Sequence, residues 1–166
     1  MKNGMKRCRT YFILAVFAAL LALVCLPAQS WGEETCPDDS GGLFAGGDGT
    51  AECPYLIATA DQLNNVRHDL GAHYKLIADI DLNVEPYNQG TGWVPIGRGS
   101  PIDDKDPFTG SFDGDGHKII NLLIKPGGDG KGLFAATGPG ATIRNIGLVN
   151  VNVQGNSSRF VGSLVG

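Results

Sequence analysis

Two six-residue segments with the same pattern, 24 positions apart, constrain the fold of this chain more than any other feature of its sequence. Residues 119–124 (IINLLI) and 143–148 (IRNIGL) both follow the pattern Ile-x-Asn-apolar-x-apolar. A repeat of roughly 20 to 50 residues in a chain of short strands and glycine turns is typical of solenoids. The repeat therefore predicts a parallel β-helix in which Ile119 lies over Ile143, with Asn121 and Asn145 one above the other at a bend. A β-sandwich with two similar strands is the alternative.

Alternation of apolar and polar residues locates the strands. Residues 74–82 (YKLIADIDL) alternate throughout, which predicts one half-buried strand with Asp79 and Asp81 on its outer face. Its inner face would carry Tyr74, Leu76, Ala78, Ile80 and Leu82. Residues 113–116 (DGDG) indicate a turn. Large apolar residues near glycine and proline are expected to close one end of the stack: Trp93, Ile96, Phe108, Phe112 and Phe134.

One short helix is expected before the long strand. Residues 55–57 (YLI) indicate a first short strand, and a capping box follows in which Thr59 and Gln62 each bond the backbone of the other. Apolar residues at helical spacing then extend the pattern, and Gly71 would provide a left-handed stop. The helix is predicted over about residues 59–70, as a cap on the stack.

The first thirty residues have the layout of a secretory signal peptide. A basic start precedes residues 11–26, which carry no charge, and Pro27 then ends any helix. Residues 28–30 (AQS) place small residues before a cleavage site at Trp31. A membrane anchor is one alternative, although a span needs about 20 apolar residues. A lipoprotein modified at Cys25 is another, which the bulky residue before that cysteine disfavours.

Composition limits the classes to which the mature chain can belong. The 166 residues suit one domain, and 25 of them are glycine. The whole chain has a formal net charge of -4, and all 17 acidic residues follow the signal segment. An acidic surface repels nucleic acid and anionic lipid. We therefore expect no nucleic-acid binding, and no membrane insertion once the signal peptide is cleaved.

Cysteine usage agrees with export. After cleavage the remaining cysteines are Cys36 and Cys53, with 16 residues between them. An exported chain meets oxidising surroundings, so these two are expected to form a disulfide that stabilises the fold by about 3 kcal/mol. The sequence contains neither a CxxC nor an HExxH motif, so no redox or zinc-protease centre is indicated.

Further short motifs carry a resemblance through their order and spacing. They are residues 46–50 (GGDGT), 54–57 (PYLI), 59–63 (TADQL), 74–82 (YKLIADIDL), 93–97 (WVPIG), 108–117 (FTGSFDGDGH), 132–134 (GLF), 143–148 (IRNIGL) and 161–166 (VGSLVG). Together they resemble the amino-terminal part of bacterial surface proteins with the GLUG motif. These include filamentous-haemagglutinin-like adhesins and the non-catalytic region of immunoglobulin-A peptidases. The final segment resembles the motif itself, through Gly162, Leu164, Val165 and Gly166.

This resemblance implies a right-handed parallel β-helix that is secreted or lies on the cell surface, and it implies no catalysis in this chain. Two features depart from the group. Ser163 occupies a position where the motif usually has glycine, and only one copy of the motif is present. Cys53 lies outside the pattern, so a pairing with Cys36 would be particular to this chain.

Candidate chemistry is sparse. Asp113 and Asp115 could supply calcium ligands, as could residues 103–106 (DDKD), but neither set has the spacing of a helix-loop-helix calcium loop, and turn formation is the simpler explanation.

Asp79 and Asp81, about 7 Å apart on one strand face, could be the acid and base of a glycosidase or lyase. A solvated strand face is the alternative. The histidines have no metal-site spacing and are expected at the surface or the cap: His68, His73 and His117. We expect no catalytic residue, no metal site and no cofactor.

These patterns predict an organisation in three parts. Residues 1–30 are the signal peptide, residues 31–54 a Gly/Asp-rich loop with the disulfide, and residues 55–166 the cap and first rungs of a β-helix. Residues 160–166 form an apolar strand without a polar cap. This predicts either a segment of a longer surface protein or a chain that associates with itself through that strand edge.

The function expected from the sequence is that of a non-enzymatic exported module. It would attach to a surface glycan or protein through its strand faces and turn loops. The alternative is the amino-terminal, non-catalytic region of a secreted protease or carbohydrate-active enzyme.

Overall fold

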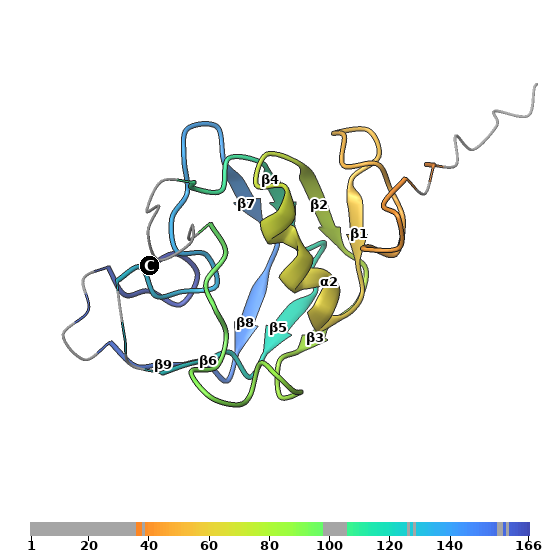
Figure 1. Ribbon diagram of the computed structural model, residues 1–166. Coiled ribbons are helices and arrows are strands. Elements are labelled where there is room, and N and C mark those ends of the chain that lie inside the picture. The colour runs from red at the N-terminus through yellow and green to blue at the C-terminus, as the bar shows by residue number, and fades with distance from the viewer. Residues whose placement is uncertain are drawn as a thin grey trace, which may run out of the picture. The chain divides into compact units, whose positions relative to one another are not determined.

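Short β-strands, one short α-helix and a turn of 3₁₀-helix make up the regular structure of the described residues, which are mainly β as the sequence predicts. The computed structural model describes residues 36–37, 39–97, 106–125, 127, 129–155, 158 and 160–166. These residues belong to one unit, Cys36–Gly166 (Figure 1). The predicted signal peptide and its cleavage site lie outside the described residues, as do Asp103 and Asp104.

The elements follow one another closely along the chain. In order they are β1 (Tyr55–Ile57), α2 (Ala60–Asn65), a 3₁₀-helix η1 (Val66–His68), β2 (His73–Leu76), β3 (Ile80–Asp81), β4 (Ser111–Asp113), β5 (Lys118–Ile120), β6 (Leu123–Ile124), β7 (Thr142–Arg144), β8 (Gly147–Val149) and β9 (Asn152–Val153).

These strands form three sheets in which every pairing is parallel. Their orders are β1-β2-β4-β7, β3-β5-β8 and β6-β9, and Figure 1 shows β2 and β4 lying between β1 and β7. From β2 onward, consecutive strands belong to different sheets: β4, β5 and β6 enter the three sheets in turn, and β7, β8 and β9 then enter them in the same order. We call residues 142–166, which carry β7 to β9, the last pass of the chain.

Isolated bridges continue the arrangement beyond the named strands. Ile96 pairs in parallel with Phe134, which in turn pairs in parallel with Val165. Lys131 pairs with Val161 in the same sense. Three segments far apart in sequence, around residues 96, 134 and 165, thus lie side by side as the strands do.

The register between strands differs from the 24-residue spacing predicted by the repeat. Ile119 lies beside Leu148 in β8, and Ile143 lies beside Phe112 in β4. The predicted stacking of Ile119 on Ile143 is therefore wrong. The strands that carry them lie in different sheets.

The passes of the chain differ in length, which explains why no single period fits. Asp79 accepts a hydrogen bond from the backbone N–H of Lys118, 39 positions later. Arg144 instead donates to Asp113 across only 31 positions. The long connection between β3 and β4 accounts for the longer pass.

The repeated pattern marks a bend after a strand. Asn121, Asn145 and Asn150 directly follow β5, β7 and β8, and each has a positive φ, of 62°, 54° and 54°. Asn tolerates this left-handed conformation better than most residues. An amide ladder is present, but Asn121 pairs with Asn150 instead of Asn145. The Asn150 amide donates to Asn121 Oδ1. Asn121 Nδ2 donates in turn to Asp81 Oδ1 at 2.8 Å.

The alternation over residues 74–82 is confirmed as a pattern of burial, but it spans two strands. Tyr74 and Leu76 in β2 are buried, and so are Ile80 and Leu82 in and after β3. Because the chain bends between them, β2 and β3 enter different sheets. Ala78 lies in this bend and is only half-buried. The prediction of one continuous strand is therefore wrong.

The helix is confirmed, although it is shorter than predicted. Thr59 Oγ1 accepts from the N–H of Gln62 at 3.2 Å, as the capping box requires. Gln62 Oε1 accepts from the N–H of Ala58, rather than from that of Thr59. Gly71 does not have a positive φ, and the helical segment ends instead where Asp69 becomes extended (φ -144°).

A single apolar core lies inside these elements. The large residues expected at an end of the stack are all buried within it: Trp93, Ile96, Phe108, Phe112 and Phe134. Leu63 and Val66 of the helical segment are fully buried as well. In the last pass the apolar residues that face the core, such as Ile143 and Leu148, are only partly buried.

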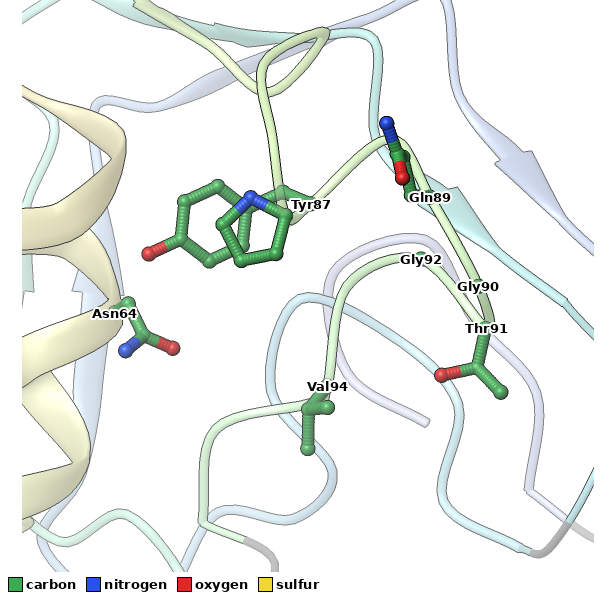
Figure 2. Close-up of a pocket in the computed structure, with 8 residues that line it drawn as sticks. Asn64, Tyr87, Gln89, Gly90, Thr91, Gly92 and Val94 are labelled. Atoms are coloured by element: carbon green, nitrogen blue, oxygen red, sulfur yellow. The ribbon is translucent and has the colours of Figure 1, made fainter.

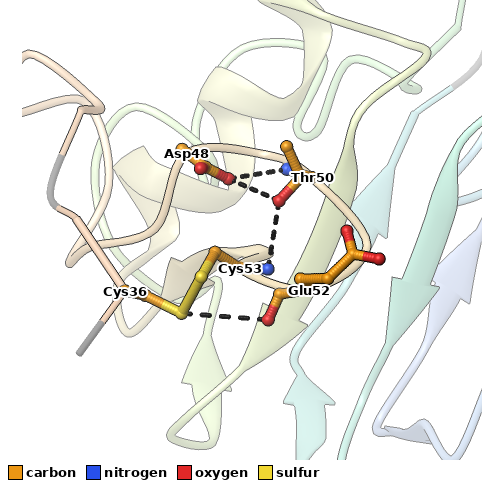
Figure 3. The surroundings of a disulfide bond; sticks show 5 residues. All are labelled: Cys36, Asp48, Thr50, Glu52 and Cys53. Carbon is orange, nitrogen blue, oxygen red and sulfur yellow. Dashed lines mark hydrogen bonds between the residues drawn. A yellow bond between two sulfur atoms is a disulfide. The ribbon is translucent and has the colours of Figure 1, made fainter. Parts of the chain in front are cut away.

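A disulfide joins Cys36 to Cys53, as predicted, with their Cα atoms 5.3 Å apart (Figure 3). Within the loop that it closes, Asp48 Oδ1 accepts from the hydroxyl of Thr50 at 2.7 Å. The loop then pairs with the outer edge of β1, because Leu56 exchanges backbone hydrogen bonds with residues 45 and 46. The disulfide therefore fixes the segment that covers the first strand.

Candidate functional site

The carboxylates that sequence analysis singled out lie at bends between sheets. Asp79 accepts from the N–H of Lys118 at 3.0 Å and lies 3.2 Å from His117 Nδ1. Asp81 accepts from the N–H of Asn83 at 2.8 Å and from the amide of Asn121. The pKa of Asp79 is lowered chiefly by the Lys118 N–H, and that of Asp81 chiefly by the Asn83 N–H.

These two environments do not resemble an acid–base pair. A general acid needs a raised pKa while its partner stays ionised. Asp79 and Asp81 are both exposed, and both have a lowered pKa. Each carboxylate holds a neighbouring strand or bend in place, which agrees with the alternative of a solvated strand face.

The calcium candidates are engaged in other contacts. Asp113 accepts from Asn145 Nδ2 at 3.0 Å and forms an ion pair with Arg144 at 2.8 Å. Its own turn contributes as well, because the N–H of Asp115 donates to Asp113 Oδ1 at 2.9 Å and thereby lowers the pKa of Asp113. Asp115 pairs with Lys75 at 3.0 Å. Among the residues that the structure describes, no group of three or more His, Cys, Asp or Glu side chains could hold a metal ion.

The histidines are distributed over different elements. His73 Nδ1 lies 2.6 Å from the Ser111 hydroxyl across the β2–β4 pairing, and His117 contacts Asp79. His68 ends the 3₁₀-helix. The structure brings none of the three together with another, in agreement with surface and cap positions.

The segment at positions 161–166, which resembles the GLUG motif, packs against an earlier segment of the chain. The N–H of Gly162 donates to the carbonyl of Lys131, and the carbonyl of Leu164 accepts from the N–H of Phe134. A Cβ on Gly162 would lie 2.0 Å from the carbonyl oxygen of Val165, so only glycine fits there. Gly166 completes the contact by donating to the Phe134 carbonyl. The motif therefore builds a tight bend in the last pass.

A surface pocket lies between α2 and the loop that precedes β4, and sequence analysis did not identify it. Its volume is 420 Å³. It is lined by Asn64, Pro86, Tyr87, Gln89, Gly90, Thr91, Gly92 and Val94, none of which is charged. Figure 2 shows Asn64 projecting from the helix toward the side chains of the loop.

Tyr87 and Arg67 join the helical segment to the loop that lines this pocket. The Tyr87 hydroxyl donates to Asp61 Oδ1 of α2 at 2.7 Å. Arg67 donates to the Val94 carbonyl at 2.9 Å and lies over the Trp93 ring, 5.7 Å from its centroid. Burial and the bond to Asp61 raise the pKa of Tyr87 to about 12, so its hydroxyl stays protonated at neutral pH.

No short sequence motif predicts this pocket. Its residues come from a helix and from a loop about twenty positions later, and each is a common surface or turn residue. The one available signal is the adjacency of Pro86, Tyr87 and glycines 90 and 92 in a long connection, which is typical of functional loops.

The described chain is thus a mainly β unit with parallel sheets, one short helix, a disulfide and an uncharged pocket. Within the ranges described, no helix is both long enough and apolar enough to cross a membrane. No family model matches the sequence.

Two relatives are similar in sequence. A protein of Evansella cellulosilytica, provisionally named a Gly-rich membrane protein, is 38% identical over 167 aligned residues, covering 98% of this chain and 18% of its own length. Halomucin of Haloquadratum walsbyi is 38% identical over 118 residues, covering 67% of this chain and 1% of its own length. The chain therefore spans less than a fifth of either relative.

One solved structure is similar as well. It is provisionally named an immunoglobulin A1 protease, from Bacteroides ovatus, and it is 34% identical. The match covers 51% of this chain and 23% of that protein, with a TM-score of 0.40.

Proposed function

We propose that this chain is an exported, non-enzymatic module of the cell surface, and that its sheets form the beginning of a right-handed β-helix used for attachment. The observation that carries the proposal is the order in which strands enter the sheets. Strands β4 to β6 and β7 to β9 enter the same three parallel sheets in succession. Parallel crossovers in one sheet are overwhelmingly right-handed.

The bends between sheets support a structural role. The ladder of Asp81, Asn121 and Asn150 joins three successive strands of one sheet, and Asp113 joins β4 to Arg144 and Asn145. Charge-assisted bonds of this kind fix loops in one arrangement. A rigid set of loops on a sheet scaffold is a common means of presenting a binding surface.

Export is supported by three independent features. The first thirty residues have the layout of a signal peptide. The disulfide between Cys36 and Cys53 is of a kind that persists in oxidising compartments. A relative that covers almost the whole chain is named as a membrane protein. We infer cleavage before Trp31 and a location outside the cell, in accord with the resemblance to GLUG-motif surface proteins.

The proposal is tested by following the full chain during export and then measuring attachment. We expect the secreted product to begin at Trp31, and its mass to be unchanged by an alkylating reagent unless a reductant is added. Inert beads coated with this product should adhere to surfaces bearing glycans or host proteins. Beads coated with an unrelated protein of similar size and charge are the matched control.

Two results would contradict the proposal. If coated beads adhere no better than the control, attachment is not the function of the chain. If the wild-type protein cleaves a glycan or a peptide and the Asp79→Asn variant does not, the chain is an enzyme, and the structural role of its carboxylates is wrong.

A further inference from the structure

The pocket beside α2 has the chemistry of a site for a small neutral ligand. We propose that it binds one neutral sugar residue of a surface glycan. This inference rests on the proposed attachment function and names the group that is recognised. The pocket volume of 420 Å³ falls within the range of about 300 to 1,000 Å³ that is typical of small-molecule sites.

The charges near the pocket are already paired, which selects against ionic ligands. Arg67 uses its guanidinium on the Val94 carbonyl, the Asn64 side chain and the Trp93 ring. Asp61 accepts from Tyr87, and Glu85, which directly precedes Pro86, accepts from the amide of Gln89. An anionic ligand would need an available guanidinium or ammonium, and a cation would need an available carboxylate. The eight lining residues provide neither.

Asn64 is placed to recognise a hydroxyl group. Its Oδ1 accepts from Arg67 Nε at 3.0 Å, which fixes the orientation of the amide, because a guanidinium can only donate. The amide N–H₂ group is thereby left as a donor, and Figure 2 shows Asn64 projecting from the helix with its side-chain oxygen on the side of the loop. Thr91 adds a hydroxyl to the lining, and Gln89 adds an amide whose N–H₂ group already donates to Glu85. Such groups match the hydroxyls of a sugar.

Apolar surface in the same pocket suits the C–H faces of a sugar ring. Val94 is 52% exposed, and it lines the pocket together with Pro86 and Tyr87. The Tyr87 ring is held by its bond to Asp61 and by packing on Trp93, with ring centroids 5.3 Å apart. Because this side chain is already held in place, ligand binding does not cost conformational entropy for ordering it.

The test is a titration of the ¹⁵N-labelled mature protein, followed by the amide shifts of residues 86–94. The probes are methyl α-mannoside, methyl β-galactoside and N-acetylglucosamine, with galacturonic acid as the anionic control. We expect saturable shifts in this loop with at least one neutral sugar, and none with galacturonic acid.

Three variants locate the site. Asn64→Ala should weaken binding about fivefold, which corresponds to about 1 kcal/mol for one hydrogen bond. Val94→Lys should abolish binding, and because Val94 is half-exposed this variant should still fold. Asn152→Ala removes an exposed amide that does not line the pocket, and it should bind as the wild type does.

The outcomes separate this inference from the proposed function. If no neutral sugar shifts the loop, or if Val94→Lys binds as the wild type does, the sugar site is wrong. Equal binding of galacturonic acid would show that the pocket does not select neutral ligands. If beads coated with wild type and with Val94→Lys adhere equally well, the attachment function stands and the pocket does not carry it. If neither adheres while the sugar still binds, the attachment function fails alone.

Discussion

The first strand and the last pass of this chain have similar apolar patterns but very different surroundings. The outer edge of β1 is covered by residues 45 and 46, and the core beneath it by Leu63 and Val66 of the helical segment. In the last pass, β7, β8 and β9 each have one neighbouring strand in the described structure. Their inward residues are only partly buried, and Phe160 nearby is 71% exposed.

This difference shows that alternation predicts direction and not burial. An apolar side chain at every second position points to one face of a strand whatever lies on that face. How much free energy it contributes depends on the apolar area removed from water, which only the neighbouring layer decides. The two regions should therefore respond differently to equivalent substitutions.

The largest expected difference in the free energy of unfolding is between substitutions at two residues that lie side by side on paired strands. Ile119 in β5 is fully buried between Ile80 and Leu148, whereas Leu148 in β8 is only partly buried. Ile119→Ala should lower the free energy of unfolding by about 3–4 kcal/mol, as for other buried large-to-small changes. Leu148→Ala should cost about 1–2 kcal/mol, because less apolar area is lost. Urea denaturation measures both.

Equal losses in these two variants would contradict the comparison, because they would mean that the last pass is as well covered as the interior. Val149→Ala provides the control. This side chain is 43% exposed on the same strand, and its loss should change stability by less than about 0.5 kcal/mol.

The second expected effect concerns the loop that covers β1. Removing the disulfide by Cys36→Ser with Cys53→Ser should lower the free energy of unfolding by about 3 kcal/mol, because a closed loop of this length restricts the unfolded chain. Amide exchange should accelerate first in β1 and leave β7 unaffected. The double variant should be insensitive to reductant, whereas wild type should lose the same stability when reduced. Faster exchange in β7 before β1 would contradict this order.

The sequence predicted local features of these regions better than distant ones. The direction of Tyr74 and Leu76, the Thr59 cap and the disulfide each follow from residues near one another or from the redox compartment. The register between strands does not follow from nearby residues. It depends on the length of the connection between β3 and β4, which the periodicity of the sequence does not predict. The repeat predicts that Asn121 and Asn145 stack in successive passes, whereas they mark bends after strands of two different sheets.

The pocket was missed for a related reason. Its polar group Asn64 lies on α2, and its apolar wall lies on residues 86–94. Arg67 and Tyr87 join the helical segment to the loop through hydrogen bonds. Neither contact has a sequence signature, since each links a common residue to a partner more than twenty positions away.

A third, smaller effect tests the bends that link passes. Asn121→Gly retains the positive φ of 62° and removes both side-chain bonds, to Asp81 and to Asn150. It should lower the free energy of unfolding by about 1 kcal/mol. Asn121→Ala should cost about 1 kcal/mol more, because alanine is strained in the left-handed conformation. If the two variants are equal in stability, the backbone conformation at this bend contributes nothing.

The smallest expected effect is a response of the last pass to acid. Asp113 holds β7 through Arg144 and Asn145. Its pKa is lowered below the ordinary value chiefly by the N–H of Asp115, and further by the bonds from Asn145 and Arg144. A carboxylate with a lowered pKa in the folded state stabilises that state above the unfolded pKa of about 4. This stabilisation is lost as the pH falls from the unfolded-state pKa through the lower pKa of the folded state.

Acidification below about pH 4 should therefore reduce the amide protection factors of Thr142–Arg144, once corrected for intrinsic exchange. Those of Tyr55–Ile57 should change less, because backbone pairing with residues 45 and 46 and the disulfide cover that strand without a carboxylate bonded to it. Asp113→Asn should remove the pH response of β7, since an amide does not titrate in this range. If β1 and β7 lose protection together, the two regions unfold as one unit, and the contrast between them is confined to burial.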